Sequence, residues 1–384
     1  STFTRRMLPI GSRTICYIIA TLIAKIIAQN ESKPLCYQKE SSPLDFVAIE
    51  PLDVKIDIDA LSDEEQQSII DKAPYWNLSC PWEWSKYSCV HQWQKSKAIS
   101  ALLYSQSLSH GSCKMSPFDG KSFYEMLKGR KVIFAGDSLS RQMMISLSCS
   151  LYKTEGMELV SDTIQWRNEW PCHGTKNCIS GGIHSGFGKG CVQFHHSEDA
   201  SKEKLEVCSH SSEKGIGITS IIKSHSLKSN FDIVISNLGI HMEKSIQKSK
   251  VKMYLDSYRN MEGLPIMIYR ESSPQHFKSQ SGGGDFDPVF AAGLTSCSKH
   301  IDFSNNLSAP ERMYLAGKVP MLSVNPMAAD IGSLHVGDGV TGKENQYKDC
   351  THWCMPGLPE IWNAQLFNYL VAHLDKLEEG TVKL

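Results

Sequence analysis

The chain has 384 residues, of which 41% are hydrophobic and 21% are charged, so it can bury a large core. Its 40 Lys and Arg residues against 41 Asp and Glu residues leave a net charge of -1. This balance excludes a global field that would attract nucleic acid or an anionic membrane. We therefore predict no nucleic-acid partner and favour a neutral or weakly charged substrate.

The N-terminal stretch, residues 1–28, differs from the rest of the chain. Arg5, Arg6 and Arg13 precede the apolar run TICYIIATLIA at 14–24. Basic residues on one flank of a short apolar run are typical of a signal peptide or a signal anchor, whereas a buried core helix rarely has them. We predict that this segment directs the chain into the secretory pathway, and we favour membrane attachment over cleavage.

Residues 29–75 are rich in proline and polar side chains and show no long apolar period, which predicts a linker or stalk. The folded body is expected to span 76–384. Its first portion, 76–125, is rich in cysteine and tryptophan.

Cysteine usage also indicates the secretory route. Of 13 cysteines, Cys16 lies inside the apolar run, and the remaining 12 form an even number suited to disulfides in an oxidising lumen. The Asn-x-Ser sequences at Asn30, Asn77 and Asn306 are possible glycosylation sites. Zinc is the competing interpretation of the cysteines, but paired C-x-x-C units are missing, so we predict no metal site.

The distribution of apolar residues predicts an α/β fold with a parallel sheet flanked by helices. Short runs rich in Val, Ile and Phe are typical of strands buried on both faces, and the segments between them have helical character. The expected strands are 131–137, 231–239 and 264–272, and the expected helices are 139–153, 245–262 and 359–379. Ligands bind at the carboxyl ends of such strands. Ser138, Asn237 and Arg270 fall there.

The sequence GDS at 136–138 follows the first strand and raises two alternatives for Ser138, a nucleophile or a helix cap. A nucleophilic serine needs a base and a group that orients the base. Near the C-terminus Asp349 and His352 are three residues apart, so one helical turn or a tight loop would present both. Ser early and Asp-x-x-His late is the order used by SGNH-type hydrolases.

Five motifs strengthen this interpretation, because together they resemble the plant trichome birefringence-like proteins and their PC-esterase relatives. They are CPWEWSKYSC, FDGKSFYEMLKGRKVIFAGDSLSRQ, IVISNLGIH, MIYRESSPQHF and DCTHWCMPGLPEIWN. The resemblance covers roughly residues 75 to 370. It implies an SGNH-hydrolase-like core with a cysteine-rich N-terminal portion, polysaccharide O-acetyltransferase activity, and a single-pass type II Golgi membrane protein, with secretion as the alternative.

The resemblance also implies roles for individual residues. Ser138 would carry the acetyl group, His352 would act as base and then acid, and Asp349 would orient His352. The side-chain amide of Asn237 and the backbone N–H of Ser138 are candidate oxyanion donors.

Gly136, Asp137 and Arg270 are assigned with Asn237 to the oxyanion and substrate-binding group. For Arg270, a structural ion pair that holds its loop is an equal alternative to substrate binding. We expect no cofactor other than an acetyl donor such as acetyl-CoA.

Two departures from the family pattern leave the acceptor open. The sequence NLGIHM lacks the tryptophans that plant relatives place there, and region 90–112 lacks the Arg-Pro-Asp and Trp-Arg-Trp elements. We predict an O-acetyltransferase acting on a polysaccharide or glycan. The alternatives are a glycan acetylesterase with the same triad and a non-catalytic cell-wall polysaccharide-binding protein.

Overall fold

The structure is a computed structural model. It describes residues 33–49, 62–64, 66, 80–81, 89, 99–100, 104, 112–164, 190–211, 217–240, 244–291, 294, 296–302, 304–306, 309–337 and 349–380. The expected targeting segment at 1–28, Asn30 and Asn77 lie outside these residues. Within the described ranges, no helix has the length and apolar character needed to span a bilayer.

Two sheets make up the strand content of the described residues. The larger sheet contains β1 (Lys131–Gly136), β2 (Met157–Asp162), β3 (Gly190–His196), β4 (Leu205–Ser211), β5 (Ile233–Ser236), β6 (Ile266–Arg270) and β7 (Met321–Leu322), and the smaller contains β8 (His335–Gly337) and β9 (Asp349–Trp353). The order in the larger sheet is β2-β3-β4-β1-β5-β6-β7. β4, β1, β5, β6 and β7 pair in parallel, whereas β3 runs antiparallel to both neighbours.

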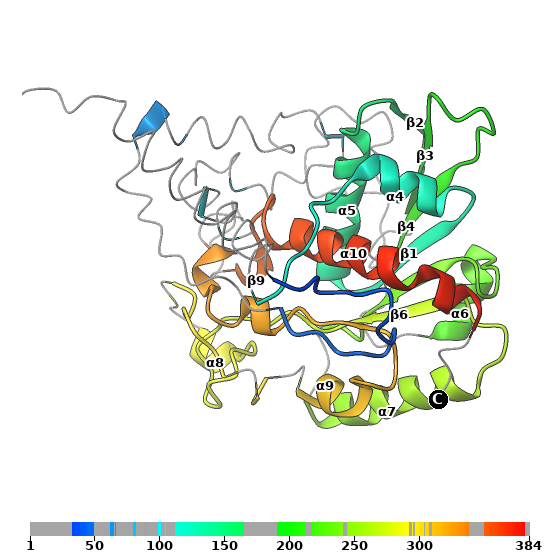
Figure 1. Cartoon of the computed structure of the whole chain (residues 1–384). Coiled ribbons are helices and arrows are strands. Elements are labelled where there is room, and N and C mark those ends of the chain that lie inside the picture. Colours follow the sequence, from blue (N-terminus) through cyan, green and yellow to red (C-terminus); the bar gives the residue numbers. More distant parts are fainter. Residues whose placement is uncertain are drawn as a thin grey trace, which may run out of the picture.

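Helices cover both faces of the larger sheet (Figure 1). They are α4 (Gly120–Leu127), α5 (Ser138–Tyr152), α6 (Ile218–His225), α7 (Lys244–Asn260), α8 (Pro288–Ala291), α9 (Ala309–Leu315) and α10 (Leu358–Glu378), with short 3-10 turns at Pro326–Ala328 and Gly332–Leu334. α4, α5 and α10 pack on one face, and α6, α7 and α9 pack on the other.

The alternation of side chains along each strand explains the two layers. In β1, Val132 and Phe134 belong to the core under α5 and α10, whereas Ile133 and Ala135 belong to the core under α6 and α7. Because both faces are covered, the strand is apolar throughout, as expected for a central parallel strand. The predicted α/β class is confirmed, and the six expected helices and strands are present within a few residues of their predicted limits.

The sequence analysis missed the antiparallel part of the sheet. β3 and β4 alternate between buried and partly exposed residues or carry polar groups, so they lack the continuous apolar pattern of β1. His196, at the end of β3, is 2% exposed and its Nε2 contacts the Glu155 carbonyl oxygen at 3.1 Å. It therefore lies in the packed sheet.

Part of the predicted linker belongs to the folded domain. Residues 33–49 lie against α10, where Gln365 donates to the Tyr37 hydroxyl at 2.8 Å and the Tyr369 hydroxyl donates to the Pro43 carbonyl at 2.7 Å. The proline-rich composition predicted a stalk, but residues 33–49 form an extended segment that side-chain hydrogen bonds hold against α10. This segment has few helix-like or strand-like signals, so composition alone could not distinguish it from a free linker.

The one described candidate glycosylation site, Asn306, is buried. Asn306 is 1% exposed, and its side-chain amide nitrogen donates to Asn325 Oδ1 at 3.3 Å. A glycan at Asn306 is therefore incompatible with the folded arrangement.

Five disulfides link the described cysteines, and two of them tie the N-terminal part of the chain to later elements. The pairs are Cys36–Cys113, Cys80–Cys149, Cys89–Cys354, Cys191–Cys208 and Cys297–Cys350. The disulfide prediction is thus confirmed for these residues. Two of the bridges end at Cys350 and Cys354, on either side of His352.

We expect peptide mapping of the oxidised full chain, without reduction, to recover peptides joined by these five bridges. The informative pair is Cys89–Cys354, because it spans 265 residues and forms only if the N-terminal portion packs against the C-terminal strand. Recovery of Cys89 or Cys354 in a different pair would show that this packing is wrong.

Candidate active site

Ser138 lies where the central strand β1 turns into α5. The N-cap of α5 is Asp137, whose carboxylate accepts from the backbone N–H groups of Leu139 at 3.0 Å and Ser140 at 3.3 Å. Ser138 is therefore the first residue of the helix and not its cap. Its hydroxyl is left available for other contacts, although the residue is only 4% exposed.

A hydrogen-bond chain joins Ser138 to His352 and Asp349. Ser138 Oγ lies 2.8 Å from His352 Nε2, and His352 Nδ1 lies 2.9 Å from Asp349 Oδ2. A carboxylate can only accept, so Nδ1 carries the proton and Nε2 is free to accept from the serine hydroxyl. This is the tautomer that a general base needs. The side chains of His352 and Asp349 are 15% and 18% exposed, so a ligand can reach them.

A bulged strand brings Asp349 and His352 together. Both lie on β9, where the sequence analysis expected a helical turn or tight loop. Residues three apart in a regular strand point to opposite faces, but the pairing of β8 with β9 shifts register between His335 and Gly337. The Asp349 carboxylate then folds back to accept from the backbone N–H groups of Thr351 and His352 at 3.1 and 3.0 Å.

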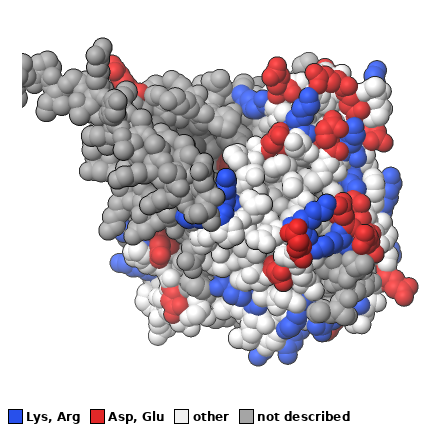
Figure 2. All heavy atoms as spheres, in the orientation of Figure 1, with Lys and Arg blue, Asp and Glu red and all other residues white. Residues whose placement is uncertain are grey.

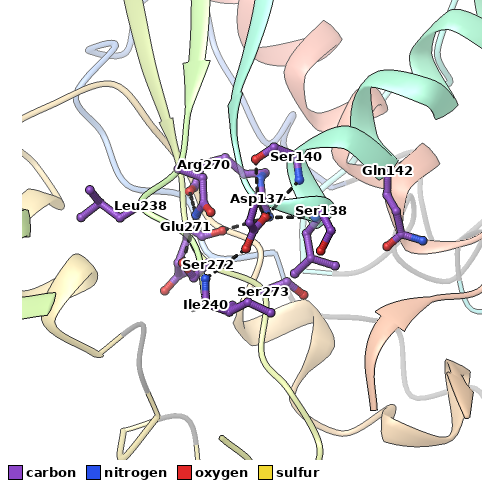
Figure 3. Close-up of polar contacts among 12 residues, drawn as sticks. Asp137, Ser138, Ser140, Gln142, Leu238, Ile240, Arg270, Glu271, Ser272 and Ser273 are labelled. Carbon is purple, nitrogen blue, oxygen red and sulfur yellow. Dashed lines mark hydrogen bonds and ion pairs between the residues drawn. The ribbon is translucent and has the colours of Figure 1, made fainter. Parts of the chain in front are cut away.

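Arg270 lies beside Asp137 and Ser140 and is closed to solvent. Its guanidinium is 3.8 Å from Asp137 Oδ1, with both side chains 0% exposed, and it donates to Ser140 Oγ at 3.3 Å. Figure 3 shows Arg270 directed toward Asp137 and Ser140. Burial lowers the pKa of Arg270, and the Asp137 carboxylate opposes this shift. The ion-pair alternative is thus the one that matches this geometry.

Asn237 and Gly136 lie at the ends of neighbouring strands. The Asn237 amide nitrogen donates to the Arg270 carbonyl and to Ser272 Oγ, both at 3.0 Å, so its two protons are engaged inside the protein. Gly136 allows the end of β1 to lie close to Asn237 and to the first turn of α5, because a Cβ there would lie 2.4 Å from Ser140 Oγ and 3.0 Å from the Asn237 carbonyl oxygen. Both residues shape the floor of the site.

Two buried carboxylates hold the segment after β6, Glu271 from within the segment and Glu311 from α9. Glu271 accepts from Arg312 at 2.7 Å and from the backbone N–H of Asn325 at 3.1 Å. Glu311 accepts from the Ser272 N–H at 2.6 Å, and burial raises its pKa to about 7. These contacts fix the segment after β6 against α9 and against the residues that follow β7.

A histidine pair that the sequence analysis did not find lies behind His352. His276 Nδ1 is 2.8 Å from His335 Nε2, His276 Nε2 is 3.1 Å from the Ala329 carbonyl, and His335 Nδ1 is 3.1 Å from the His352 carbonyl. Two neutral imidazoles carry two N–H groups, and carbonyls cannot donate, so a neutral pair satisfies two of these three contacts. The pair is formed by residues 59 positions apart, which no local pattern reveals.

Among the described residues one group has metal-ligating atoms close together, namely Cys191, Cys208 and His225. Cys191 and Cys208 form a disulfide, so neither offers a thiolate. This group therefore gives no support for a metal at the serine site.

The family comparison agrees with this geometry. The PC-Esterase model, described as the GDSL/SGNH-like Acyl-Esterase family found in Pmr5 and Cas1p, matches residues 115–269 and 317–369. The chain belongs to the PC-esterase family. The matched ranges include Ser138 and both members of the Asp349 and His352 pair, and the SGNH-like fold expected for the family is the one described above.

Individual relatives are plant proteins. Protein trichome birefringence-like 4 of Arabidopsis thaliana is 25% identical over 346 residues, covering 77% of this chain and 71% of the relative. Protein trichome birefringence-like 42 of the same plant is 23% identical, covering 68% and 76%. Xylan O-acetyltransferase 14 of Oryza sativa subsp. japonica is 21% identical, covering 68% and 67%.

The buried ion pair leads to a prediction about stability. Asp137→Asn keeps a side chain that caps helices well but leaves Arg270 buried without its counter-ion, so we expect a loss of about 3–5 kcal/mol in the free energy of unfolding. Asp119 caps α4 with the same pattern, and its pKa is lowered mainly by a hydrogen bond from Ser122 rather than by a buried cation. Asp119→Asn is the matched control and should cost less than about 0.5 kcal/mol. Equal losses in urea unfolding would contradict the role given to Arg270.

The histidine pair leads to a prediction about pH. Burial lowers the pKa of His276 to about 4 and that of His335 well below its usual value, with Asp330 and His300 facing His276, and Asp349 and His352 facing His335. The unfolded chain therefore binds more protons as the pH falls from the unfolded pKa of 6.5 toward 4, so the free energy of unfolding decreases in this window. We expect His276→Gln to flatten that dependence in urea titrations at several pH values. The same slope in the variant would contradict the assignment.

Proposed function

We propose that this protein transfers an acetyl group from a donor to a polysaccharide hydroxyl through an acetyl ester on Ser138. The observation that carries the proposal is the continuous hydrogen-bond chain from Ser138 through His352 to Asp349. Membership of a family described as acyl-esterases supports the acyl chemistry. The name of the rice relative, a xylan O-acetyltransferase, supports a plant polysaccharide as the acceptor.

The first half-reaction acylates the serine. As Ser138 Oγ attacks the acetyl carbonyl carbon of the donor, His352 Nε2 takes the hydroxyl proton and becomes an imidazolium. Asp349 holds the proton on Nδ1 and stabilises the imidazolium charge. When the tetrahedral intermediate collapses, the bond to the leaving group breaks, and His352 returns the proton to that group.

The second half-reaction runs through the same atoms. A sugar hydroxyl attacks the acetyl-Ser138 carbonyl while His352 Nε2 removes its proton. Collapse breaks the ester bond to Ser138 Oγ, which regains the proton from His352. The acetyl group ends on the sugar, and the protein is restored without gain or loss of electrons.

Oxyanion stabilisation needs donors aimed at the carbonyl oxygen. We assign the backbone N–H of Ser138 at the start of α5, where the helix dipole also favours negative charge. We keep Asn237 as a second donor that would have to exchange its contacts with Arg270 and Ser272 when substrate binds. Gly136, Asp137 and Arg270 shape and support this group rather than contact the acceptor.

Surface charge is compatible with a weakly charged acceptor. Figure 2 shows Lys and Arg interspersed with Asp and Glu over the described part of the face in view, with both signs near one another. Together with the net charge of -1, this favours recognition by hydroxyl and apolar contacts over a strong field. An acetyl donor such as acetyl-CoA and no other cofactor is what the proposal requires.

We further propose a secretory location, with the chain held in the Golgi membrane by its N-terminal segment. The basic residues before the apolar run at 14–24 support this placement. The five disulfides support an oxidising compartment.

Hydrolysis of a glycan acetyl ester is the second candidate function, and the family description as acyl-esterases favours it. The same three residues would serve, with water replacing the sugar hydroxyl in the second half-reaction. The fate of the acetyl group therefore separates the two activities.

We expect the full chain incubated with 4-nitrophenyl acetate to gain one acetyl group, seen as intact mass and located on the Ser138 peptide. Ser138→Ala should show no gain, because the attacking oxygen is absent. Asp349→Asn should slow acylation about 10³–10⁴-fold, because it loses the group that fixes the His352 tautomer.

Adding acetyl-free xylan distinguishes the activities. Loss of the adduct with acetyl recovered on xylan supports the transferase, whereas release as free acetate supports the esterase. Labelling of Ser138→Ala equal to that of the unmodified chain would contradict the serine intermediate. Retained xylan binding without any acylation would favour the third alternative, a polysaccharide-binding protein.

A further inference from the structure

Gln142 connects the helix that begins with Ser138 to the strand that carries His352. It lies one helical turn after Ser138 on α5 and is 0% exposed. Its amide nitrogen donates to the Trp353 carbonyl at 2.9 Å, and its amide oxygen accepts from the Trp353 N–H at 3.3 Å. In Figure 3 its side chain extends away from α5 toward β9.

These two contacts replace a strand neighbour. On one edge β9 pairs with β8, and the Cys354 N–H donates to the Leu334 carbonyl at 3.1 Å next to the paired residues His335 and Trp353. In an antiparallel pair, donors of successive residues point to opposite edges. The N–H and C=O of Trp353 therefore face away from β8, and the Gln142 amide meets both, as a neighbouring strand would.

The side chain of Trp353 is fixed as well. Its indole N–H donates to Ser273 Oγ at 2.9 Å, and its ring stacks on His335 with centroids 3.6 Å apart and planes inclined by 25°. With the residue 0% exposed, the indole has no space in which to shift. The backbone directly after His352 is thus anchored to α5 by Gln142 and to its surroundings by the indole.

We propose that Gln142 is a positioning residue that sets the separation of Ser138 Oγ and His352 Nε2. The proposal rests on the proposed function, since it assigns Gln142 to the acylation of Ser138. Gln142 is four residues after Ser138 and contacts the residue that follows His352, so it bridges the two elements beside the 2.8 Å contact between serine and histidine. Proton transfer depends steeply on that contact, and a misplacement of about 1 Å can cost about 10²-fold in rate.

The test compares Gln142 with a second buried glutamine. Gln142→Met keeps the length of the side chain and removes both contacts. Gln365 is also 0% exposed, and its amide nitrogen donates to the Tyr37 hydroxyl and the Ser323 carbonyl, away from both α5 and β9. Gln365→Met is therefore the matched control for the loss of a buried amide.

We expect Gln142→Met to slow acylation of Ser138 by 4-nitrophenyl acetate by about 10- to 100-fold. The ester concentration at half-maximal rate should change by less than about twofold, because Gln142 is closed to solvent and does not contact the ester. Gln365→Met should acylate Ser138 at a rate within about twofold of that of the unmodified chain, even if its thermal midpoint falls as far as that of Gln142→Met. A purely structural role for Gln142 would instead give both variants the same rates.

Gln142→Glu gives an independent readout. A carboxylate still accepts from the Trp353 N–H but cannot donate to the Trp353 carbonyl, whereas a protonated carboxyl can do both. Burial beside a carbonyl raises the pKa of the introduced carboxyl. Its acylation rate, divided by that of the unmodified chain at each pH, should therefore rise toward one as the pH falls. This variant keeps the volume of glutamine and carries the test if Gln142→Met does not fold.

The outcomes separate the two proposals. Unmodified acylation rates in both Gln142→Met and Gln142→Glu, with Ser138 still labelled, would overturn the role of Gln142 and leave the proposed function intact. A rate ratio for Gln142→Glu that is low and independent of pH would also overturn it. Acetylation that persists in Ser138→Ala would overturn the proposed function itself, and with it the role of Gln142.

Discussion

The buried Asp137 carboxylate is the group on which the arrangement of the site depends. It caps α5, accepts from the Ile240 N–H at 3.0 Å, and lies beside the Arg270 guanidinium. One side chain thus fixes the helix that starts with Ser138, the loop after β5 and the end of β6. Removing a buried carboxylate that has several donors and a cation is costly, because these partners would stay buried without the acceptor that offsets their desolvation. Ser138 is held in place by this cluster, and Asp137 rather than Ser138 caps the helix.

The segment that follows β6 connects this buried cluster to the strand that contains His352. On the side of Ser138, Ser272 Oγ accepts from the Asn237 amide. On the side of His352, Ser273 Oγ accepts from the Trp353 indole, and Gln275 donates to Thr351 Oγ1 at 2.7 Å. The His276 N–H donates to the Cys350 carbonyl at 2.9 Å. Successive residues of one short segment therefore contact both halves of the site. This accounts for a dense run of polar residues that are buried yet stay clear of the reacting atoms.

The sequence was sufficient where structure is encoded locally. The apolar run of β1, the helix after it and the long helix α10 could each be recognised from a short window of sequence. The GDS sequence and the Asp-x-x-His spacing identified the three side chains that meet. β9 was mistaken for a turn because its bulge depends on the register with β8, and the antiparallel strands were missed because their alternating polarity is weak. Gln142, His276 and His335 act through contacts between distant segments, which a single sequence does not encode in any local pattern.

The two disulfides around His352 determine when its strand becomes fully restrained. Cys350 is bonded to Cys297 and Cys354 to Cys89, so disulfides attach β9 near both of its ends to two segments that lie far apart in the sequence. Before those bonds form, the strand that contains His352 is restrained by non-covalent contacts alone. Oxidation of these cysteines is therefore a maturation step, which completes the restraint on β9 only under conditions that allow disulfides to form.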